Sequence, residues 1–216
     1  MKIALIDYDA GNLHSVHKAL MVAAHSAGIA LDISVGADPD IICRADRIVL
    51  PGDGAFADCV GHLRCIDGLS EALSEAVHQK ARPFLGICVG MQLLATKGME
   101  LGETAGLGWF DGTVERIQPN DKALKVPHMG WNTLDLQREH PLLKDVLVGT
   151  NGLHAYFLHA YHFIPQNIDD VIATSDYGQA ITAVIAKDNI AGTQFHPEKS
   201  QKLGMHVLQN FLDWTP

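Results

Sequence analysis

A single cysteine near the middle of the chain stands in a frame that could make it a nucleophile. Cys88 lies between Gly86 and Gly90 in GICVGMQ, after an apolar run and before a helical pattern. Glycine–any–nucleophile–any–glycine is typical of a strained strand-to-helix turn that presents a reactive side chain. There the helix N-terminus would favour the thiolate, and the Val89 N–H could bind an oxyanion. The alternative is an ordinary buried cysteine, a common core residue.

A histidine and a glutamate near the C-terminus could complete such a site. A cysteine nucleophile needs a base, and the base needs a group that orients it. In GTQFHPEKS, Pro197 pushes His196 into an extended conformation, so His196 and Glu198 point to the same side. The carboxylate can fix the imidazole tautomer and leave the other ring nitrogen for the Cys88 thiol. The alternative is a polar turn before the last helix.

The composition excludes several classes of protein. The net charge is −9, which disfavours nucleic-acid binding because phosphate contacts need clustered Lys and Arg. None of the four cysteines forms a CxxC pair and no HExxH occurs, so we expect no metal, and no nucleotide or flavin signature suggests a cofactor. No apolar stretch is long enough for a membrane span. We therefore expect a cytoplasmic protein with free thiols.

The hydrophobic pattern predicts an α/β fold with a central, mostly parallel sheet, helices on both faces and an antiparallel strand extension in the second half. A helix is expected from Asn12 to Gly28, where these residues would cap its two ends. We see no linker and expect one domain, residues 1–216. Strands are predicted at 2–8, 31–35, 46–52, 83–87 and in five segments between 108 and 195, and further helices at 68–81, 90–98 and 200–214.

Six motifs, in order along nearly the whole chain, resemble those of the class I, or triad, glutamine amidotransferases. Within that class the chain is most similar to the glutaminase subunits of imidazole glycerol phosphate synthase. The segment VPHMGWN is the most selective of the six, and the resemblance implies the fold of the class. The motifs are DYDAGNL (7–13), LPGDGAF (50–56), GICVGMQLL (86–94), VPHMGWN (126–132), YFLHAYHF (156–163) and GTQFHPEKS (192–200).

The resemblance implies a reaction and a role for each site residue. Cys88 would attack the side-chain amide of glutamine, His196 would move protons, and Glu198 would orient His196. The released ammonia would pass to a cyclase barrel subunit in a heterodimer, which makes imidazole glycerol phosphate and aminoimidazole carboxamide ribotide (AICAR) in histidine biosynthesis. The positions that match glutamine-binding ones are Gln92, Glu100 and the backbone around Ala160 and Tyr161.

The resemblance also implies an oxyanion strand and a partner interface. In LPGDG, the backbone N–H of Asp53 would be a second oxyanion donor, and Gly52 and Gly54 would let it rotate; the alternative is an ordinary turn. The partner would contact segments that hold exposed aromatic and Met residues, although core packing would also suit Met129 and Trp131. The residues in these segments are Asn12, Pro127, Met129, Trp131 and Tyr156.

Three positions depart from the family pattern. Asp53 stands where an apolar residue is usual, and its carboxylate would oppose an oxyanion, so we expect it to face outward. Ala160 replaces a common Ser or Thr, and Val89 replaces a common Leu. Two alternatives stay open: a paralogous glutaminase that serves another synthase, for example in surface-sugar amination, and a silent binding subunit, which would need a lost triad member.

Overall fold

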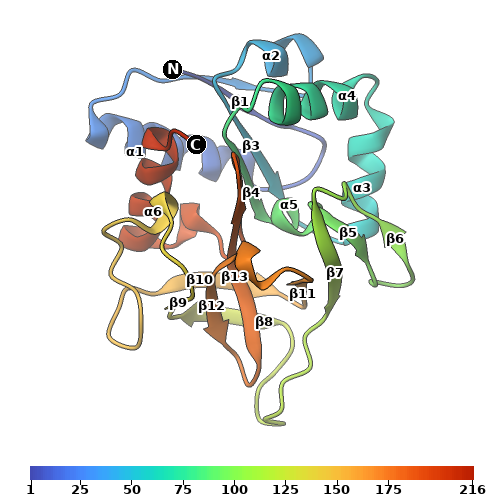
Figure 1. Cartoon of the computed structure of the whole chain (residues 1–216), viewed down its shortest axis with the longest axis vertical. Coiled ribbons are helices and arrows are strands. Elements are labelled where there is room, and N and C mark those ends of the chain that lie inside the picture. The colour runs from blue at the N-terminus through green and yellow to red at the C-terminus, as the bar shows by residue number, and fades with distance from the viewer.

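The structure, a computed structural model that describes residues 1–216, is built on an eight-stranded mixed sheet (Figure 1). The first five strands in spatial order form four parallel pairs, and the last three strands add antiparallel pairs. The predicted fold class is thus confirmed. In spatial order the strands are β2 (Asp32–Val35), β1 (Lys2–Leu5), β3 (Arg47–Gly52), β4 (Phe84–Cys88), β14 (Ile190–Thr193), β13 (Ala180–Lys187), β12 (Val171–Asp176) and β9 (Asp135–Leu136).

Helices lie on both sides of the main sheet and bury both faces of its central parallel strands, β3 and β4 (Figure 1). On one side α1 (Leu13–Ala27) packs against α6 (Gln201–Asp213). On the other lie α2 (Pro39–Arg44), α3 (Phe56–Cys65) and α4 (Leu69–Ser74), which continues as a π-helical turn, Glu75–Gln79. None of these helices has the length and apolar character needed to cross a membrane.

The other strands between residues 95 and 165 form two further, smaller sheets beside the main one. A two-stranded ribbon pairs β8 (His128–Asn132) with β10 (Ala155–His159). A four-stranded sheet contains β11 (Tyr161–Pro165), β7 (Phe110–Arg116), β5 (Ala95–Gly98) and β6 (Thr104–Ala105). Short 3₁₀ turns occur at Pro141–Leu143, Ile168–Asp170 and Pro197–Lys199. One hydrophobic cluster of 57 buried residues runs through the molecule.

The helix that the sequence predicts over 90–98 is wrong in its second half. The helix α5 (Val89–Gln92) has only four residues, and β5 begins at Ala95. The carbonyls of residues 93 to 95 accept hydrogen bonds from the N–H groups of residues 107 to 110, so tertiary pairing replaces the helical bonds. The dipole of α5 therefore stabilises a Cys88 thiolate less than the predicted longer helix would, because so short a helix has a small dipole.

Other boundaries agree with the pattern. Asn12 and Gly28 are the caps of α1, and the Asn12 side chain accepts a hydrogen bond from the N–H of Ser15. Ser200 is the N-cap residue of α6, but its hydroxyl is used elsewhere. It donates to the carbonyl of His196 at 2.6 Å and accepts from the N–H of Tyr156 at 2.9 Å. Ser200 thereby ties the His196 segment to β10.

Candidate active site

Three adjacent parallel strands bring the predicted catalytic segments together. Gly52 of β3 is in register with Cys88 of β4, and Ile87 of β4 is in register with Thr193 of β14. The oxyanion strand, Cys88 and the segment that leads to His196 therefore leave the same edge of the sheet. The carboxyl ends of parallel strands are where α/β proteins form their sites.

Cys88 occupies a strained turn, as the motif predicts. Its backbone has φ 55° and ψ −113°, a conformation that residues with a Cβ rarely adopt. The two flanking glycines permit close backbone packing. A Cβ on Gly86 would lie 2.6 Å from the carbonyl oxygen of Gly90, and a Cβ on Gly90 would overlap the carbonyl of Leu50 in β3. The glycines therefore let the turn fold back on itself and against the neighbouring strand.

His196 is held between Glu198 and Cys88. Its Nδ1 lies 2.9 Å from Oε1 of Glu198, and the two side chains are 7% and 1% exposed. Burial lowers the pKa of the His196 imidazole, but hydrogen bonds with Cys88 and Glu198 and the charges on both groups outweigh it and raise the pKa to about 10. Cys88 itself is 2% exposed. Glu198 and Cys88 thus hold His196 as an imidazolium at neutral pH.

Two of the predicted glutamine-binding residues meet near the thiol. The side-chain Nε2 of Gln92 donates to the carbonyl of Tyr161 at 2.9 Å. Ala160 lies at the bend between β10 and β11, and its carbonyl accepts a hydrogen bond from the N–H of Ile117. Glu100 is placed differently: its Oε2 accepts a hydrogen bond from the N–H of Phe56 at 2.8 Å. In this structure Glu100 therefore holds the start of α3, directly after the oxyanion strand.

Side chains that the sequence motifs did not single out hold the carbonyls of the oxyanion strand. The Tyr8 hydroxyl donates to the carbonyl of Pro51 at 2.8 Å, and the Cys59 thiol donates to the carbonyl of Asp53 at 3.3 Å. Burial raises the pKa of Tyr8, so its hydroxyl keeps its proton and remains a donor. Asp53 is exposed, which agrees with an outward carboxylate. Gly54 has φ 99°, a value that suits glycine.

Sequence reasoning also missed Gln194, which directly contacts the nucleophile. Its Nε2 lies 3.7 Å from Sγ of Cys88, and its Oε1 accepts from Gln92 at 2.9 Å. The same two-residue spacing that pairs His196 with Glu198 places Gln194 on their side of an extended segment. That signal was present in the sequence.

The predicted partner segments are mostly exposed. Met129 and Trp131 are 67% and 47% exposed, which rules out core packing for both. Trp131 pairs with Tyr156 across the ribbon, and Met129 pairs with Leu158, which is 36% exposed. Asn12 and Pro127 are exposed as well. We call Met129, Trp131, Tyr156 and Leu158 the ribbon patch.

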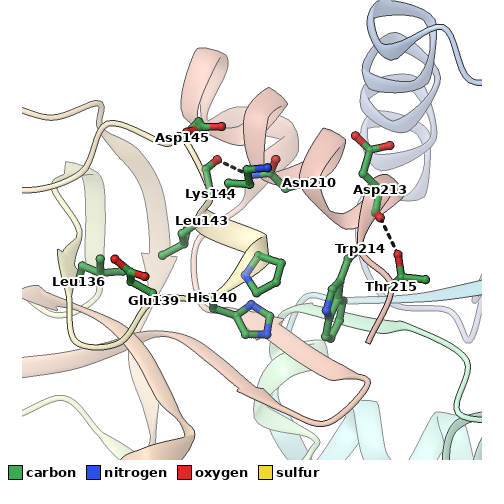
Figure 2. Close-up of a pocket in the computed structure, with 11 residues that line it drawn as sticks. Leu136, Glu139, His140, Leu143, Lys144, Asp145, Asn210, Asp213, Trp214 and Thr215 are labelled. Carbon is green, nitrogen blue, oxygen red and sulfur yellow. Dashed lines mark hydrogen bonds between the residues drawn. The ribbon is translucent and has the colours of Figure 1, made fainter.

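Two cavities lie apart from the thiol. One of about 910 Å³ lies between the loop at residues 136–145 and the end of α6, and none of the predicted site residues lines it (Figure 2). In Figure 2, Asn210 bonds to the backbone of Lys144, and the His140 ring faces Trp214. A second cavity, about 460 Å³, is bounded by Met129 and Trp131. No group of three or more His, Cys, Asp or Glu side chains is placed to hold a metal ion.

The fold and the site match one class of enzyme. The family model for glutamine amidotransferase class-I matches residues 4–214. A crystal structure of a glutamine amidotransferase superposes with a TM-score of 0.68 at 18% identity and covers 97% of each chain. A putative GMP synthase subunit from Thermoplasma acidophilum gives 0.67 at 19%, over 99% of this chain and 92% of its own. The chain belongs to the class-I glutamine amidotransferases.

Three relatives that match this chain over its full length have the same name. The imidazole glycerol phosphate synthase subunits HisH of Bradyrhizobium diazoefficiens and Rhodopseudomonas palustris are each 55% identical to this chain over 216 residues, all of both chains. The subunit HisH of Mesorhizobium japonicum is 51% identical over the same span.

Proposed function

We propose that this chain is the glutaminase subunit of an imidazole glycerol phosphate synthase, and that it hydrolyses glutamine to glutamate and ammonia for histidine biosynthesis. The names of the full-length relatives support this assignment. The observation that carries it is the placement of Cys88 on a strained turn beside the His196–Glu198 pair.

The chemistry follows from the charges at the site. The Cys88 thiolate attacks the side-chain carbonyl carbon of glutamine, and the electrons of the carbonyl move onto its oxygen. The His196 imidazolium gives its proton to the leaving nitrogen, which departs as ammonia and leaves a glutamyl thioester. Neutral His196 then takes a proton from water, which attacks the thioester and releases glutamate. Glu198 stabilises the imidazolium and keeps Nε2 directed at the reacting atoms.

The oxyanion would be bound by the backbone N–H groups of Val89 and Asp53. Val89 follows the nucleophile directly, and Asp53 follows Gly52, the last residue of β3, which is in register with Cys88. Each donor of this kind is worth about 10²–10³ in rate. Rotation of one peptide between Gly52 and Gly54 would therefore switch the glutaminase. Glycine at position 54, which has φ 99°, makes such a rotation sterically cheap because it reaches either sign of φ.

The partner would be the cyclase subunit, bound at the ribbon patch as a heterodimer. Free ammonia in neutral water is mostly protonated, and ammonium has no lone pair, so passage through a dry interface keeps it reactive. The exposed Met129 and Trp131 suit such an interface. We propose that the whole chain, 1–216, is one amidotransferase domain, in keeping with its continuous core, and that it acts in the cytoplasm.

A single substitution tests the assignment. In the complex with a cyclase subunit, Cys88→Ala should abolish glutamine-dependent synthesis but leave ammonia-dependent synthesis unchanged, because only the nucleophile is lost. Cys65→Ala, which removes an exposed thiol, is the control and should retain both activities. Glutamine-dependent turnover by Cys88→Ala would refute Cys88 as the nucleophile. Failure of a histidine-pathway cyclase to stimulate the wild-type chain would point to another synthase.

A further inference from the structure

A chain of side-chain amides ends on the sulfur of Cys88. Gln194 is fully buried, with 0% exposure, and Gln92 is 3% exposed. Gln92 lies between the carbonyl of Tyr161 and Oε1 of Gln194, and its Nε2 is 2.9 Å from each. Gln194 in turn places its Nε2 3.7 Å from Sγ of Cys88. Three side chains, two from the Cys88 turn and α5 and one from the segment after β14, thus form one connected network.

The backbone carbonyl of Tyr161 fixes the direction of every hydrogen bond in this network. A carbonyl can only accept, so the group of Gln92 that faces it must be the NH₂. The second proton of that NH₂ points at Gln194, whose facing atom must therefore be the oxygen. The amide of Gln194 then has to present its NH₂ to Cys88. The usual ambiguity between amide oxygen and nitrogen is removed by the network itself.

An N–H donor at the sulfur favours the charged form of the nucleophile. Burial alone disfavours a thiolate, and Cys88 is 2% exposed. The four-residue helix α5 offers only a small dipole. His196 supplies a positive charge on one side, and Gln194 supplies a neutral donor that no proton transfer removes. An oxygen in the place of Nε2 would instead repel the thiolate.

We propose that Gln194 is a further catalytic residue of this site: its side-chain amide stabilises the Cys88 thiolate, and Gln92, anchored on Tyr161, orients that amide. The proposal rests on the proposed function for the role of Cys88 in turnover. The state of the thiolate itself is measurable without glutamine.

The test is the pH dependence of Cys88 alkylation by iodoacetamide, followed at the Cys88 peptide by mass spectrometry. Gln194→Met keeps the length of the side chain and removes the donor. The midpoint of its alkylation profile should rise by about one to two pH units relative to the wild type, since a hydrogen bond to a charged group is lost. Gln194→Leu should shift in the same direction. Gln137→Met, at an exposed glutamine that bonds to Asp135 and Thr174, should leave the profile unchanged.

A second variant tests the orienting role of Gln92. Gln92→Leu should raise the midpoint by less than Gln194→Met does, and the double variant should match Gln194→Met alone, because both changes act through one donor. An unchanged midpoint in Gln92→Leu would overturn the orienting role. An unchanged midpoint in a folded Gln194→Met or Gln194→Leu would overturn the whole proposal, even if the wild-type complex uses glutamine. Loss of glutamine use in the wild type, with the alkylation shift intact, would instead refute the proposed function.

Discussion

At the scale of single residues, the site depends on the balance of charge around one imidazole. His196 is buried, and that alone would keep it neutral, but Glu198 on one side and Cys88 on the other raise its pKa to about 10. Only Oε1 of Glu198 is hydrogen bonded, while Oε2 is buried without a partner. The Glu198 charge is therefore directed at His196 and at no other group. A site of this kind should be sensitive to removal of that charge.

We expect Glu198→Gln to lower kcat for glutamine about 10²–10⁴-fold with little change in the fold, because a neutral amide no longer stabilises the imidazolium or fixes its tautomer. The measurement is steady-state glutaminase activity in the presence of the cyclase subunit. Glu115→Gln, at an exposed glutamate of β7, should retain wild-type activity. A kcat for Glu198→Gln within about twofold of the wild type would contradict the orienting role.

At the scale of secondary-structure elements, strands β8, β10 and β11 carry three buried histidines. His128 stacks between Phe157 and Tyr177, with ring centroids 4.7 and 3.9 Å away. Burial lowers the pKa of His128 and His162 to about 4. It also lowers the pKa of His159, to about 3, and the nearby histidines add to the effect. These strands are therefore stable only while their histidines are neutral.

The lowered pKa values of these three histidines predict that acid destabilises the fold. As pH falls from about 6.5 to 4, these histidines bind protons in the unfolded chain but stay neutral in the folded chain. The free energy of unfolding should therefore fall by up to about 1.4 kcal/mol per pH unit for each histidine. His196 does not contribute to this slope. Its raised pKa stabilises the fold fully below about pH 6.5, and that stabilisation is lost only as pH rises toward 10. Urea unfolding at about pH 7, 6 and 5 measures the slope.

A pair of substitutions checks the origin of the slope. His128→Phe preserves the stacking and removes one titrating group, so its stability should depend less steeply on pH than that of the wild type. His14→Gln, at an exposed histidine of α1, should leave the slope unchanged. Equal wild-type stability at about pH 7 and 5 would show that these histidines are not the buried neutral groups of this structure.

Much at this scale was predictable from the sequence. Apolar runs in the sequence predicted the strands β1, β3 and β4, and the capping residues Asn12 and Gly28 predicted the two ends of α1. The turn at Cys88 followed from its two glycines. The helices α2 and α3 were not predicted, and β5 was taken for helix. For β5 the reason is tertiary, because carbonyls at residues 93 to 95 pair with residues 107 to 110, which no local pattern indicates.

At the scale of the whole molecule, strand β10 connects the ribbon patch to the nucleophile on β4. Leu158 of β10 presents a partly exposed side chain outward, while its carbonyl lies 3.9 Å from Sγ of Cys88. The adjacent His196 N–H donates to the carbonyl of Tyr156 on the same strand. A partner that moves β10 would therefore act directly on the catalytic residues. Sequence motifs indicated Met129, Trp131 and Tyr156. The two-residue spacing from His196 could have indicated Gln194, but Leu158 required the strand pairing with Met129.

We expect the double variant Met129→Ser/Trp131→Ala to weaken cyclase binding about 10–100-fold, because exposed aromatic and Met anchors carry much of an interface's affinity. Titration of the chain with the cyclase, followed by calorimetry and by glutaminase activity, measures both binding and activation. Ile168→Ser, which removes another exposed apolar side chain at 74% exposure outside the ribbon, is the control. Unchanged affinity in the double variant would place the interface elsewhere.

In the proposed mechanism, Cys88 bonds covalently to glutamine, His196 transfers the protons and Glu198 orients His196. The most direct measurement is acid quenching of the cyclase complex during glutamine turnover, followed by peptide mass spectrometry. We expect a glutamyl thioester on the peptide that contains Cys88 and none on those with Cys43, Cys59 or Cys65. Glutamate formation with no adduct at Cys88, or with the adduct on another cysteine, would contradict this mechanism.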